Sequence, residues 1–408
     1  MKAPFKGFLG GLLLAAGCVT GTPPEFRGDP PMDFPEPDAV DAVVFLIGDA
    51  GDATPDNSPV LRRLAADVEY WAELLERDSA VTVAFLGDNV YPVGVRDRGH
   101  PEFAADSARL WSQIGVLAGP FARERGAAGF FLAGNHDWGN TIGEMGVVRL
   151  QNQAALLDSA RADGIAVSMV PAPGDPGPWV NDVRSNVRLM AIDTHWFLQS
   201  PTAQARNEFF LSVYEAMVAA EDRHLIMMAH HPYQSAGPHG LLTPGDQGLG
   251  LMYLMRRSGA LVQDLNSPIY DDFRRRLDGT FEQVGRPPLV FAAGHDHSLQ
   301  VLDPDSEGGP ETVLVSGAGS KLTAVADAPE LRYAASRPGY MMLIFRSNEA
   351  VDLYVVAAPT ADPTCPEGEG FDRESCMAET TEGIALVYAE RLAPEASLPD
   401  TSAVSPRR

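Results

Sequence analysis

The sequence predicts an α/β protein in which strands and helices are layered into a sandwich around one core. Three observations lead to this prediction. Short apolar runs typical of buried strands alternate with helical segments from about residue 41 onward. Glycine and polar residues directly follow many of these runs, where open α/β sheets place their sites. The chain has 408 residues, of which 45% are hydrophobic and 21% are charged, enough for one large domain or two modest ones.

The expected strands are short, apolar and bounded by turn residues. They cover Val43–Ile47, Val81–Leu86, Gly129–Ala133, Val187–Ile192, His224–Ala229 and Leu289–Ala293, with closing strands at Val313–Ser316, Met341–Phe345 and Val351–Val356. Ser58 and Pro59 are typical of an N-cap and a first-turn proline, so a helix is expected after them. Its apolar face comprises Leu61, Leu64, Val68, Trp71 and Leu75. Further helices are expected over residues 103–117 and 205–220, and near Ile384–Leu392.

The N-terminus has the layout of a secretory signal peptide over residues 1–17. Lys2 and Lys6 precede an apolar run that is too short to span a bilayer. The run ends in Leu14-Ala15-Ala16-Gly17-Cys18, which resembles a bacterial lipobox, whose cysteine is lipidated. The alternative is an ordinary signal peptide with a chance cysteine. We therefore expect an exported protein that is anchored through Cys18 to a membrane of the cell envelope, at the outer membrane or the periplasmic face.

Composition divides the rest of the chain into three parts. Residues 18–40 are rich in proline and acidic residues, which is typical of a tether. Residues 41–357 contain the alternating strands and helices, and residues 358–408 form a polar extension with a disordered end. Cys365 and Cys376 are expected to form a disulfide in this extension, because export leads to an oxidising compartment. Two free thiols are the alternative.

The charge is strongly acidic, with a formal net value of −24. This makes nucleic acid an unexpected partner, because binding to its backbone depends on patches of Lys and Arg. Lysine occurs only at positions 2, 6 and 321, so arginine supplies nearly all the positive charge. An acidic surface does not attract phosphate esters. A substrate of that kind would need local positive charge, such as bound metal.

Five loops that follow expected strands carry similar polar residues. They are Gly48-Asp49-Ala50-Gly51, Gly87-Asp88-Asn89-Val90-Tyr91, Gly134-Asn135-His136-Asp137, His230-His231-Pro232 and Gly294-His295-Asp296-His297. Each motif alone is weak, since Gly-Asp after a strand is usually a turn and paired histidines are usually solvated. Together, their oxygen and nitrogen ligands, without thiolates, suit first-row transition metals. If the loops converge, they would serve two ions about 3.5–4 Å apart.

This order of motifs resembles the calcineurin-like metallophosphoesterase superfamily, from Asp41 to about Phe345. Gly51 stands where the first motif usually ends in a metal-binding histidine, and Tyr91 lies three residues after Asp88. Losing that histidine and gaining a tyrosine is the signature of the purple acid phosphatases, in which a tyrosinate binds ferric iron. The small single-domain, tartrate-resistant type is most similar. The further runs that support this are Gly294-His295-Asp296-His297-Ser298-Leu299-Gln300, Ser316-Gly317-Ala318-Gly319 and the paired His230 and His239.

The resemblance implies a metallophosphoesterase-like sandwich of two mixed β-sheets flanked by helices, with residues 41–357 as the catalytic domain. It assigns Asp49, Tyr91 and His297 to Fe(III), Asn135, His230 and His295 to a divalent ion (Fe, Zn or Mn), and Asp88 to both. This agrees with the preference of a trivalent ion for anionic oxygen donors.

The resemblance also implies hydrolysis of phosphate monoesters by a metal-bound hydroxide, the reaction of an acid phosphatase. Bound metal lowers the pKa of its water to about 7, so no separate side-chain base is needed. His136 and His239 are the candidates for contacting the phosphate and protonating the leaving oxygen. The expected substrate is a phosphorylated small molecule or a phosphopeptide.

Four residues near the motifs each keep more than one interpretation. Asp137 orients an imidazole or caps the next turn, and His231 is expected to support the site by packing. His195 is expected to be structural, and Lys321 contacts phosphate or is simply solvated. The alternatives for the whole chain are a phosphodiesterase or nucleotide hydrolase on the same fold, and a surface lipoprotein without catalytic activity.

Overall fold

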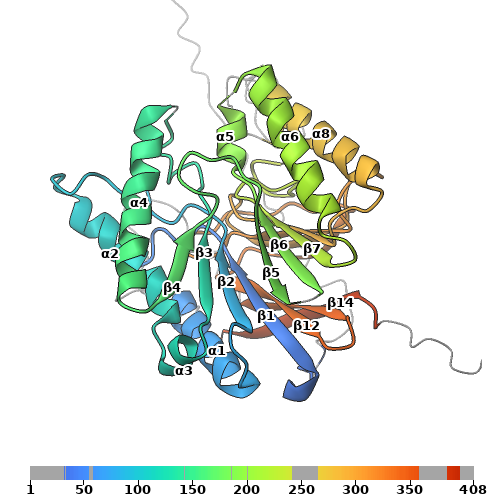
Figure 1. Cartoon of the computed structure of the whole chain (residues 1–408), viewed down its shortest axis with the longest axis horizontal. Coiled ribbons are helices and arrows are strands. Elements are labelled where there is room, and N and C mark those ends of the chain that lie inside the picture. Colours follow the sequence, from blue (N-terminus) through green and yellow to red (C-terminus); the bar gives the residue numbers. More distant parts are fainter. Residues whose placement is uncertain are drawn as a thin grey trace, which may run out of the picture.

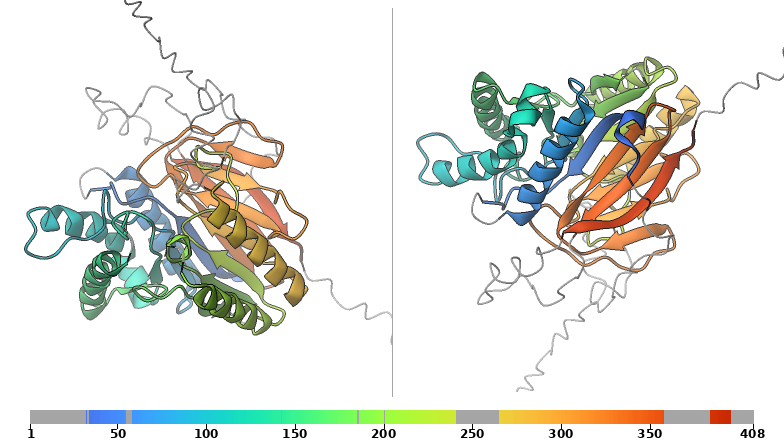
Figure 2. Two further views of the ribbon diagram at one scale, coloured as in Figure 1. Left: turned by 90° about the horizontal axis from the view of Figure 1, so that it is seen from above. Right: turned by 90° about the horizontal axis from the view of Figure 1, so that it is seen from below.

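The structure is a computed structural model that describes residues 32, 34–54, 58–141, 143–184, 186–199, 201–240, 265–357 and 384–395. The signal peptide, Cys18, most of the tether and both cysteines of the expected disulfide lie outside the described residues. Within these ranges, no helix is both long enough and apolar enough to cross a membrane. Two seven-stranded sheets pack face to face, with helices on both outer sides (Figures 1 and 2). The predicted layered α/β sandwich of two mixed sheets is therefore confirmed.

The first sheet has the strand order β14-β13-β12-β1-β2-β3-β4. Its strands are β1 (Val40–Ile47), β2 (Val81–Phe85), β3 (Ala128–Phe131), β4 (Ala166–Met169), β12 (Gly339–Arg346), β13 (Val351–Ala357) and β14 (Ala385–Ala393). The four strands β1 to β4 are parallel. The last three strands of the chain join antiparallel on the far side of β1.

The second sheet has the strand order β11-β9-β10-β8-β7-β6-β5. Its strands are β5 (Trp179–Arg184), β6 (Val187–Ala191), β7 (His224–Met228), β8 (Val290–Ala293), β9 (Leu299–Leu302), β10 (Thr312–Ser316) and β11 (Leu331–Ala335). Its central strands β6, β7, β8 and β10 are parallel, and the outer strands are antiparallel. The carboxyl ends of parallel strands lie at one edge of a sheet, so each sheet presents its following loops there.

The helices cover the two outer faces (Figure 2). Those on the side of the first sheet are α1 (Pro59–Leu75), α2 (Phe103–Ile114), α3 (Pro120–Glu124) and α4 (Glu144–Ala162), with 3-10 turns at Pro37–Ala39 and Gly115–Leu117. Those on the other side are α5 (Thr194–Leu198), α6 (Ala203–Val218) and α8 (Pro268–Val284). Helix α1 begins at Pro59 as predicted, but the Ser58 hydroxyl donates to the carbonyl of Thr54 and does not cap the helix.

Strand β1 shows why the two sheets and the helices pack as they do. Its side chains alternate between two cores, as the two-residue period of a strand requires. Val43, Phe45 and Ile47 join the core under α1. Ala42, Val44 and Leu46 face the second sheet. Both faces of the strand are therefore buried, which explains its continuous apolar sequence.

The prediction of a helix near Ile384–Leu392 is wrong, because these residues form β14 at the edge of the first sheet. The strand pairs antiparallel with β13, and Arg391 Nε lies 2.8 Å from Asp352 Oδ1 on its neighbour. Paired backbone groups and a partner for buried Asp352 outweigh the local helical pattern. This part of the expected C-terminal extension therefore continues the sandwich.

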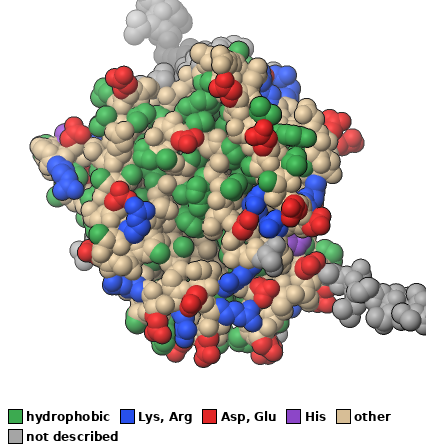
Figure 3. Space-filling model, in the orientation of Figure 1, with side chains coloured by type: hydrophobic (Ala, Val, Ile, Leu, Met, Phe, Trp, Pro, Cys, Tyr) green, Lys and Arg blue, Asp and Glu red, His purple; other side chains and the backbone are tan. Residues whose placement is uncertain are grey.

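The surface drawn in Figure 3 mixes both signs of charge. Acidic and basic side chains are interspersed on this face, and hydrophobic side chains gather in its middle (Figure 3). A positive potential at any one place must therefore come from local groups rather than from a broad basic area on this face.

Candidate metal centre

Loops from both sheets bring the nine predicted site residues together. Asp49, Asp88 and Asn135 follow β1, β2 and β3 of the first sheet, whereas His230 and His295 follow β7 and β8 of the second. The backbone φ angle is positive at three of these residues: 58° at Asp49, 54° at Asp88 and 70° at His295. Positive φ is uncommon outside glycine and clusters at functional sites, where the surrounding structure maintains it.

Glycines allow the loops to approach this closely. A Cβ atom at Gly134 would lie 2.2 Å from Asp88 Oδ1, and one at Gly294 would lie 2.5 Å from Asp49 Oδ2. Both contacts are far shorter than any allowed for carbon and oxygen. Gly134 and Gly294 are therefore required for the close approach of neighbouring loops.

Asp49, Tyr91 and His297 form one compact group of donor atoms. The Tyr91 hydroxyl lies 3.0 Å from Asp49 Oδ1 and 3.2 Å from His297 Nε2. His297 Nε2 lies 3.5 Å from the same Asp49 oxygen, which closes a triangle. Two ligand atoms about 2.1 Å from one ion lie about 3.0 to 3.4 Å apart, so the triangle has the size that a metal ion requires.

A second group forms around His230 Nε2. This atom lies 2.9 Å from Asn135 Oδ1, 3.3 Å from His295 Nδ1 and 3.4 Å from Asp88 Oδ1. The other ring nitrogen, Nδ1, lies 2.9 Å from the carbonyl of Leu86, which can only accept a hydrogen bond. Nδ1 therefore carries the hydrogen, and Nε2 presents a lone pair to the group.

The contact between Asn135 and His230 indicates a missing positive charge. The amide nitrogen of Asn135 donates to Asn140 Oδ1 at 2.8 Å, which turns its oxygen toward His230. The Asn135 oxygen and the His230 lone pair are both acceptors, yet they lie 2.9 Å apart without a hydrogen between them. Burial lowers the pKa of His230, so a second proton on the ring, at Nε2, is a poor explanation. A metal cation fits this arrangement, because it would bind both lone pairs.

Electrostatics across the two groups also favours a cation. Burial, together with the nearby Asp88 carboxylate, raises the pKa of Asp49 well above its usual value. Burial and then the same two carboxylates raise the pKa of the Tyr91 hydroxyl. Ligand atoms of Asp49, Asp88 and His230 lie within 4.8 Å of one another, so Asp88 links the two groups. A bound ion reverses the cost of burying these anionic oxygens.

The two candidate catalytic histidines lie at the edge of the candidate metal site. His136 packs edge-on against Tyr91, with ring centroids 4.5 Å apart, and its side chain is 28% exposed. Its Nδ1 lies 2.6 Å from the carbonyl of Pro92, and its Nε2 lies 3.9 Å from Asp88 Oδ2. The ring of His239 lies 4.2 Å from that of His295, between centroids. Both imidazoles therefore lie beside the donor groups without being part of either triangle.

Asp137 holds loops together and makes no hydrogen bond to an imidazole within the described part of the chain. Its buried carboxylate accepts from the backbone N–H groups of Asn89, Val90 and Gly134 at 2.8 to 3.1 Å. Burial, assisted by Asp88, raises its pKa to about 8. The sequence offers two interpretations of Asp137, and the structure agrees better with the one in which it caps a turn. The backbone that it holds includes the loop of Asp88.

His231 lies behind the site, where it packs as expected. Its ring lies 4.4 Å from that of His295, and its Nδ1 lies 2.8 Å from the hydroxyl of Thr194. Its Nε2 is buried and has no hydrogen-bond partner among the described residues. His230, His231 and His295 could also hold an ion together. The sequence contains no local signal for Thr194, because its contact with His231 joins residues 37 positions apart.

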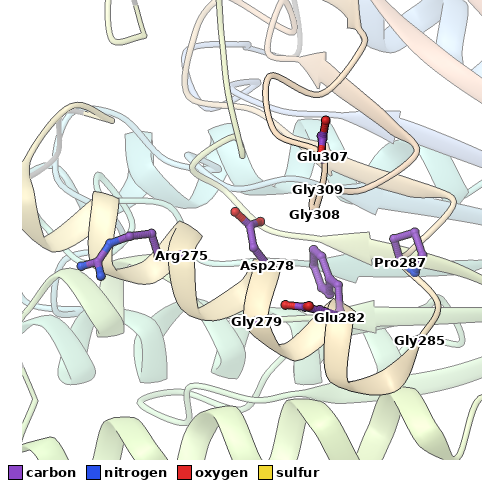
Figure 4. Close-up of a pocket in the computed structure, with 10 residues that line it drawn as sticks. Arg275, Asp278, Gly279, Glu282, Gly285, Pro287, Glu307, Gly308 and Gly309 are labelled. Carbon is purple, nitrogen blue, oxygen red and sulfur yellow. The ribbon is translucent and has the colours of Figure 1, made fainter.

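A cavity of about 830 Å³ lies elsewhere, against helix α8 (Figure 4). It is lined by residues that include Arg275, Asp278, Glu282 and Glu307, and by none of the nine predicted site residues. It contains no group of nitrogen and oxygen donors comparable with those around His230. The chemistry of the side chains therefore places the candidate site at the strand ends rather than in this cavity.

Comparisons with known proteins give likeness in fold. No protein-family description and no curated protein sequence matches the chain. PhoD superposes with a TM-score of 0.50 at 12% identity, over 80% of this chain and 68% of that one. GAP50, the anchor in the inner membrane complex of Plasmodium, superposes with a TM-score of 0.49 at 13% identity, over 84% of this chain and 96% of that one. The purple acid phosphatase PPD1 from yellow lupin seeds superposes with a TM-score of 0.47 at 15% identity, over 79% of this chain and 52% of that one. The two-sheet α/β sandwich is thus shared with a solved structure.

Proposed function

We propose that this protein is a phosphoric ester hydrolase that acts on phosphate monoesters with a pair of metal ions. The observation that carries the proposal is the pair of donor groups joined through Asp88, in which ligand atoms lie 2.9 to 3.5 Å apart and the Asn135 oxygen faces the His230 lone pair at 2.9 Å. Two ions in such an arrangement would clamp both oxygens of an in-line displacement at phosphorus.

The donor atoms suggest which ion each group would hold. Asp49 and Tyr91 offer a carboxylate and a phenolate, which suit Fe(III), and His297 completes that group. Asn135, His230 and His295 offer neutral donors, which suit a divalent ion such as Fe, Zn or Mn. Bound ions of this kind would supply Lewis acidity and an activated water.

The chain's own contribution to the reaction would be positioning and proton transfer. The carbonyl of Pro92 accepts a hydrogen bond from His136 Nδ1 at 2.6 Å, which fixes the ring with Nε2 toward Asp88. In its protonated form, His136 could therefore donate a hydrogen from Nε2 to a phosphoryl or leaving oxygen. His239, beside His295, is the second candidate for this role.

Metal analysis of the purified protein, with its visible spectrum and its activity on model esters, tests the proposal. We expect two ions per chain, one of them iron, and faster hydrolysis of 4-nitrophenyl phosphate than of bis(4-nitrophenyl) phosphate. A preference for the diester would favour a phosphodiesterase or nucleotide hydrolase on the same fold. A site that binds no metal would favour a surface lipoprotein without catalytic activity.

We also propose, from the N-terminal sequence alone, that the protein is exported and lipid-anchored through Cys18. The support is the run of small residues before that cysteine, which resembles a lipobox. Cys18→Ala should release the protein into the soluble fraction or leave its signal peptide uncleaved. Unchanged partitioning of this variant into detergent would contradict the anchor.

A further inference from the structure

Lys321 lies against the candidate metal centre. Its Nζ atom is 3.7 Å from the centroid of the Tyr91 ring, over the face of that ring. The same ring is packed edge-on by His136, a candidate phosphate contact. Lys321 is partly exposed, so its ammonium group can meet a ligand from solvent. It is also the only lysine among the residues that the structure describes, in a chain of net charge −24.

The backbone on both sides of Lys321 is fixed to the loops that carry the predicted ligands. The N–H of Gly319 donates to the carbonyl of Gly48 at 3.1 Å, and the N–H of Thr323 donates to the carbonyl of His297 at 2.8 Å. Between them, the Ser320 hydroxyl donates to the carbonyl of Asp49 at 2.5 Å. Lys321 is therefore held in place by the metal-site loops themselves, which is the preorganisation that a binding residue needs.

Among the described residues, the ammonium group has no ion-pair partner to neutralise it. In the described ranges, no carboxylate lies within 4.0 Å of Nζ, although arginines of this protein form many such pairs. A cation over an aromatic face keeps its N–H donors available, because the ring attracts the charge without accepting all three hydrogens. The geometry leaves a positive charge at the edge of the site.

We infer that Lys321 binds a non-bridging oxygen of the substrate's phosphoryl group and thereby favours dianionic phosphate monoesters over monoanionic diesters. The inference rests on the proposed function and specifies its substrate class. A phosphate monoester carries up to two negative charges on its phosphoryl oxygens, whereas a diester carries one. One added positive charge at the edge of the site stabilises the dianion more, and a charged hydrogen bond is stronger than a neutral one.

Binding of inorganic phosphate to the metal-loaded protein tests this inference. Calorimetric titrations would compare wild type, Lys321→Met, Lys321→Arg and Arg275→Met, each after its metal content has been measured. Arg275 is an exposed arginine on α8, so its replacement controls for the change in net charge. We expect phosphate to bind about 10-fold to 100-fold more weakly to Lys321→Met, the loss of one hydrogen bond between charged groups. Lys321→Arg should lose much less affinity for phosphate, and Arg275→Met should bind phosphate as tightly as wild type.

A kinetic measurement distinguishes a loss of selectivity for monoesters from a general loss of activity. The ratio of kcat/KM for 4-nitrophenyl phosphate to that for bis(4-nitrophenyl) phosphate should fall in Lys321→Met, mainly through KM for the monoester. If wild type binds phosphate and Lys321→Met binds it equally well, the inference is wrong and the proposed function stands. Loss of metal from Lys321→Met would also overturn it, because Lys321 would then act on the centre itself. If wild type with both metals binds no phosphate, the proposed function fails together with the inference.

Discussion

The two sheets contribute chemically different halves of the candidate metal centre. Loops of the first sheet supply oxygen atoms, from Asp49, Asp88, Tyr91 and Asn135, and loops of the second supply imidazole nitrogens. Neither half completes a donor group alone, since the group of Asp49 needs His297 and the group of Asn135 needs His230. Bound ions would therefore connect the sheets as well as serve the reaction, and their binding should add to the stability of the fold.

The side chains of the two halves also differ in how burial shifts their pKa values. In the first half, burial raises the pKa of Asp49, so this carboxyl group resists negative charge. Burial acts on Asp88 in the same direction, but the nearby His230 and His136 outweigh it and lower the pKa of Asp88. In the second half, burial lowers the pKa of His297 to about 4 and that of His295 well below its usual value, so these two imidazoles resist protonation. Imidazoles that stay neutral in mild acid remain available as metal ligands there.

Removing the residue that joins the halves should have the largest effect. Asp88 Oδ1 lies 3.4 Å from His230 Nε2, and the Asp88 carboxylate adds to burial and to Asp49 in raising the pKa of Tyr91 in the other group. We expect Asp88→Ala to abolish hydrolysis and to lower the occupancy of both metals, measured by elemental analysis. Asp106→Ala is the matched control, because it removes an equally buried carboxylate, paired with Arg96 at 2.8 Å, from α2. Intact metal content with near-normal turnover in Asp88→Ala would show that the site is elsewhere.

His136 should have a large effect on turnover but little on metal binding. It lies beside the oxygen half without belonging to either triangle, and its Nε2 is 3.9 Å from Asp88. We expect His136→Ala to keep its metals while kcat falls by about 10²- to 10⁴-fold, the usual loss when acid–base assistance is removed. The exposed His100 offers a matched His→Ala control away from the site. If the metals leave together with the imidazole, His136 is a ligand.

The comparison of the halves also explains what the sequence could predict. Strands such as β1 and β7 are buried on both faces, so their apolar runs are continuous and the polar motif after each is easily recognised. Strands β5 and β11 escaped prediction because their pattern is short and mixed. Helix α4 escaped because its buried side includes Gly146 and Gln153. For the candidate site, the five motifs contain eight of the nine predicted residues that the structure brings together, and the resemblance added His239. The tie of Asp137 to Asn89, 48 residues away, depends on tertiary contacts alone.

Tyr91→Phe should sharpen the distinction between the two donor groups. The substitution keeps the ring that packs against His136 but removes the hydroxyl 3.0 Å from Asp49. A phenolate bound to ferric iron absorbs visible light, so wild type should be purple or pink and the variant colourless. Iron should be held less tightly in the variant, with the second ion less affected. Tyr388→Phe, which removes a hydroxyl 2.8 Å from Glu390 on β14, is the control. A colourless, fully active wild type with two divalent ions would mean that Tyr91 only packs there.

The smallest effect concerns a carboxylate at the strand ends of the histidine-bearing sheet. Asp193 follows β6, is buried, and accepts hydrogen bonds from Trp196 N–H at 3.0 Å and from Trp138 Nε1 at 2.9 Å. Burial nevertheless raises its pKa to about 7. The pKa in the unfolded chain is about 3.9, so the native state binds more protons than the unfolded state between roughly pH 4 and 7. The carboxylate therefore reduces the free energy of unfolding as pH rises through this window.

Asp193→Asn cannot titrate, so it isolates this contribution. The free energy of unfolding of Asp193→Asn, relative to wild type, should rise between pH 4 and 7 by at most about 4 kcal/mol and stay constant above. Its absolute stability can be lower throughout, because the amide cannot accept from both tryptophans. Asp182, on β5 of the same sheet, should show the opposite dependence of stability on pH. Its hydrogen bond with Arg188 lowers its pKa, so wild type should lose its advantage over Asp182→Asn as pH falls. Parallel curves for Asp193→Asn and wild type in urea titrations across this range would show that Asp193 is ionised throughout.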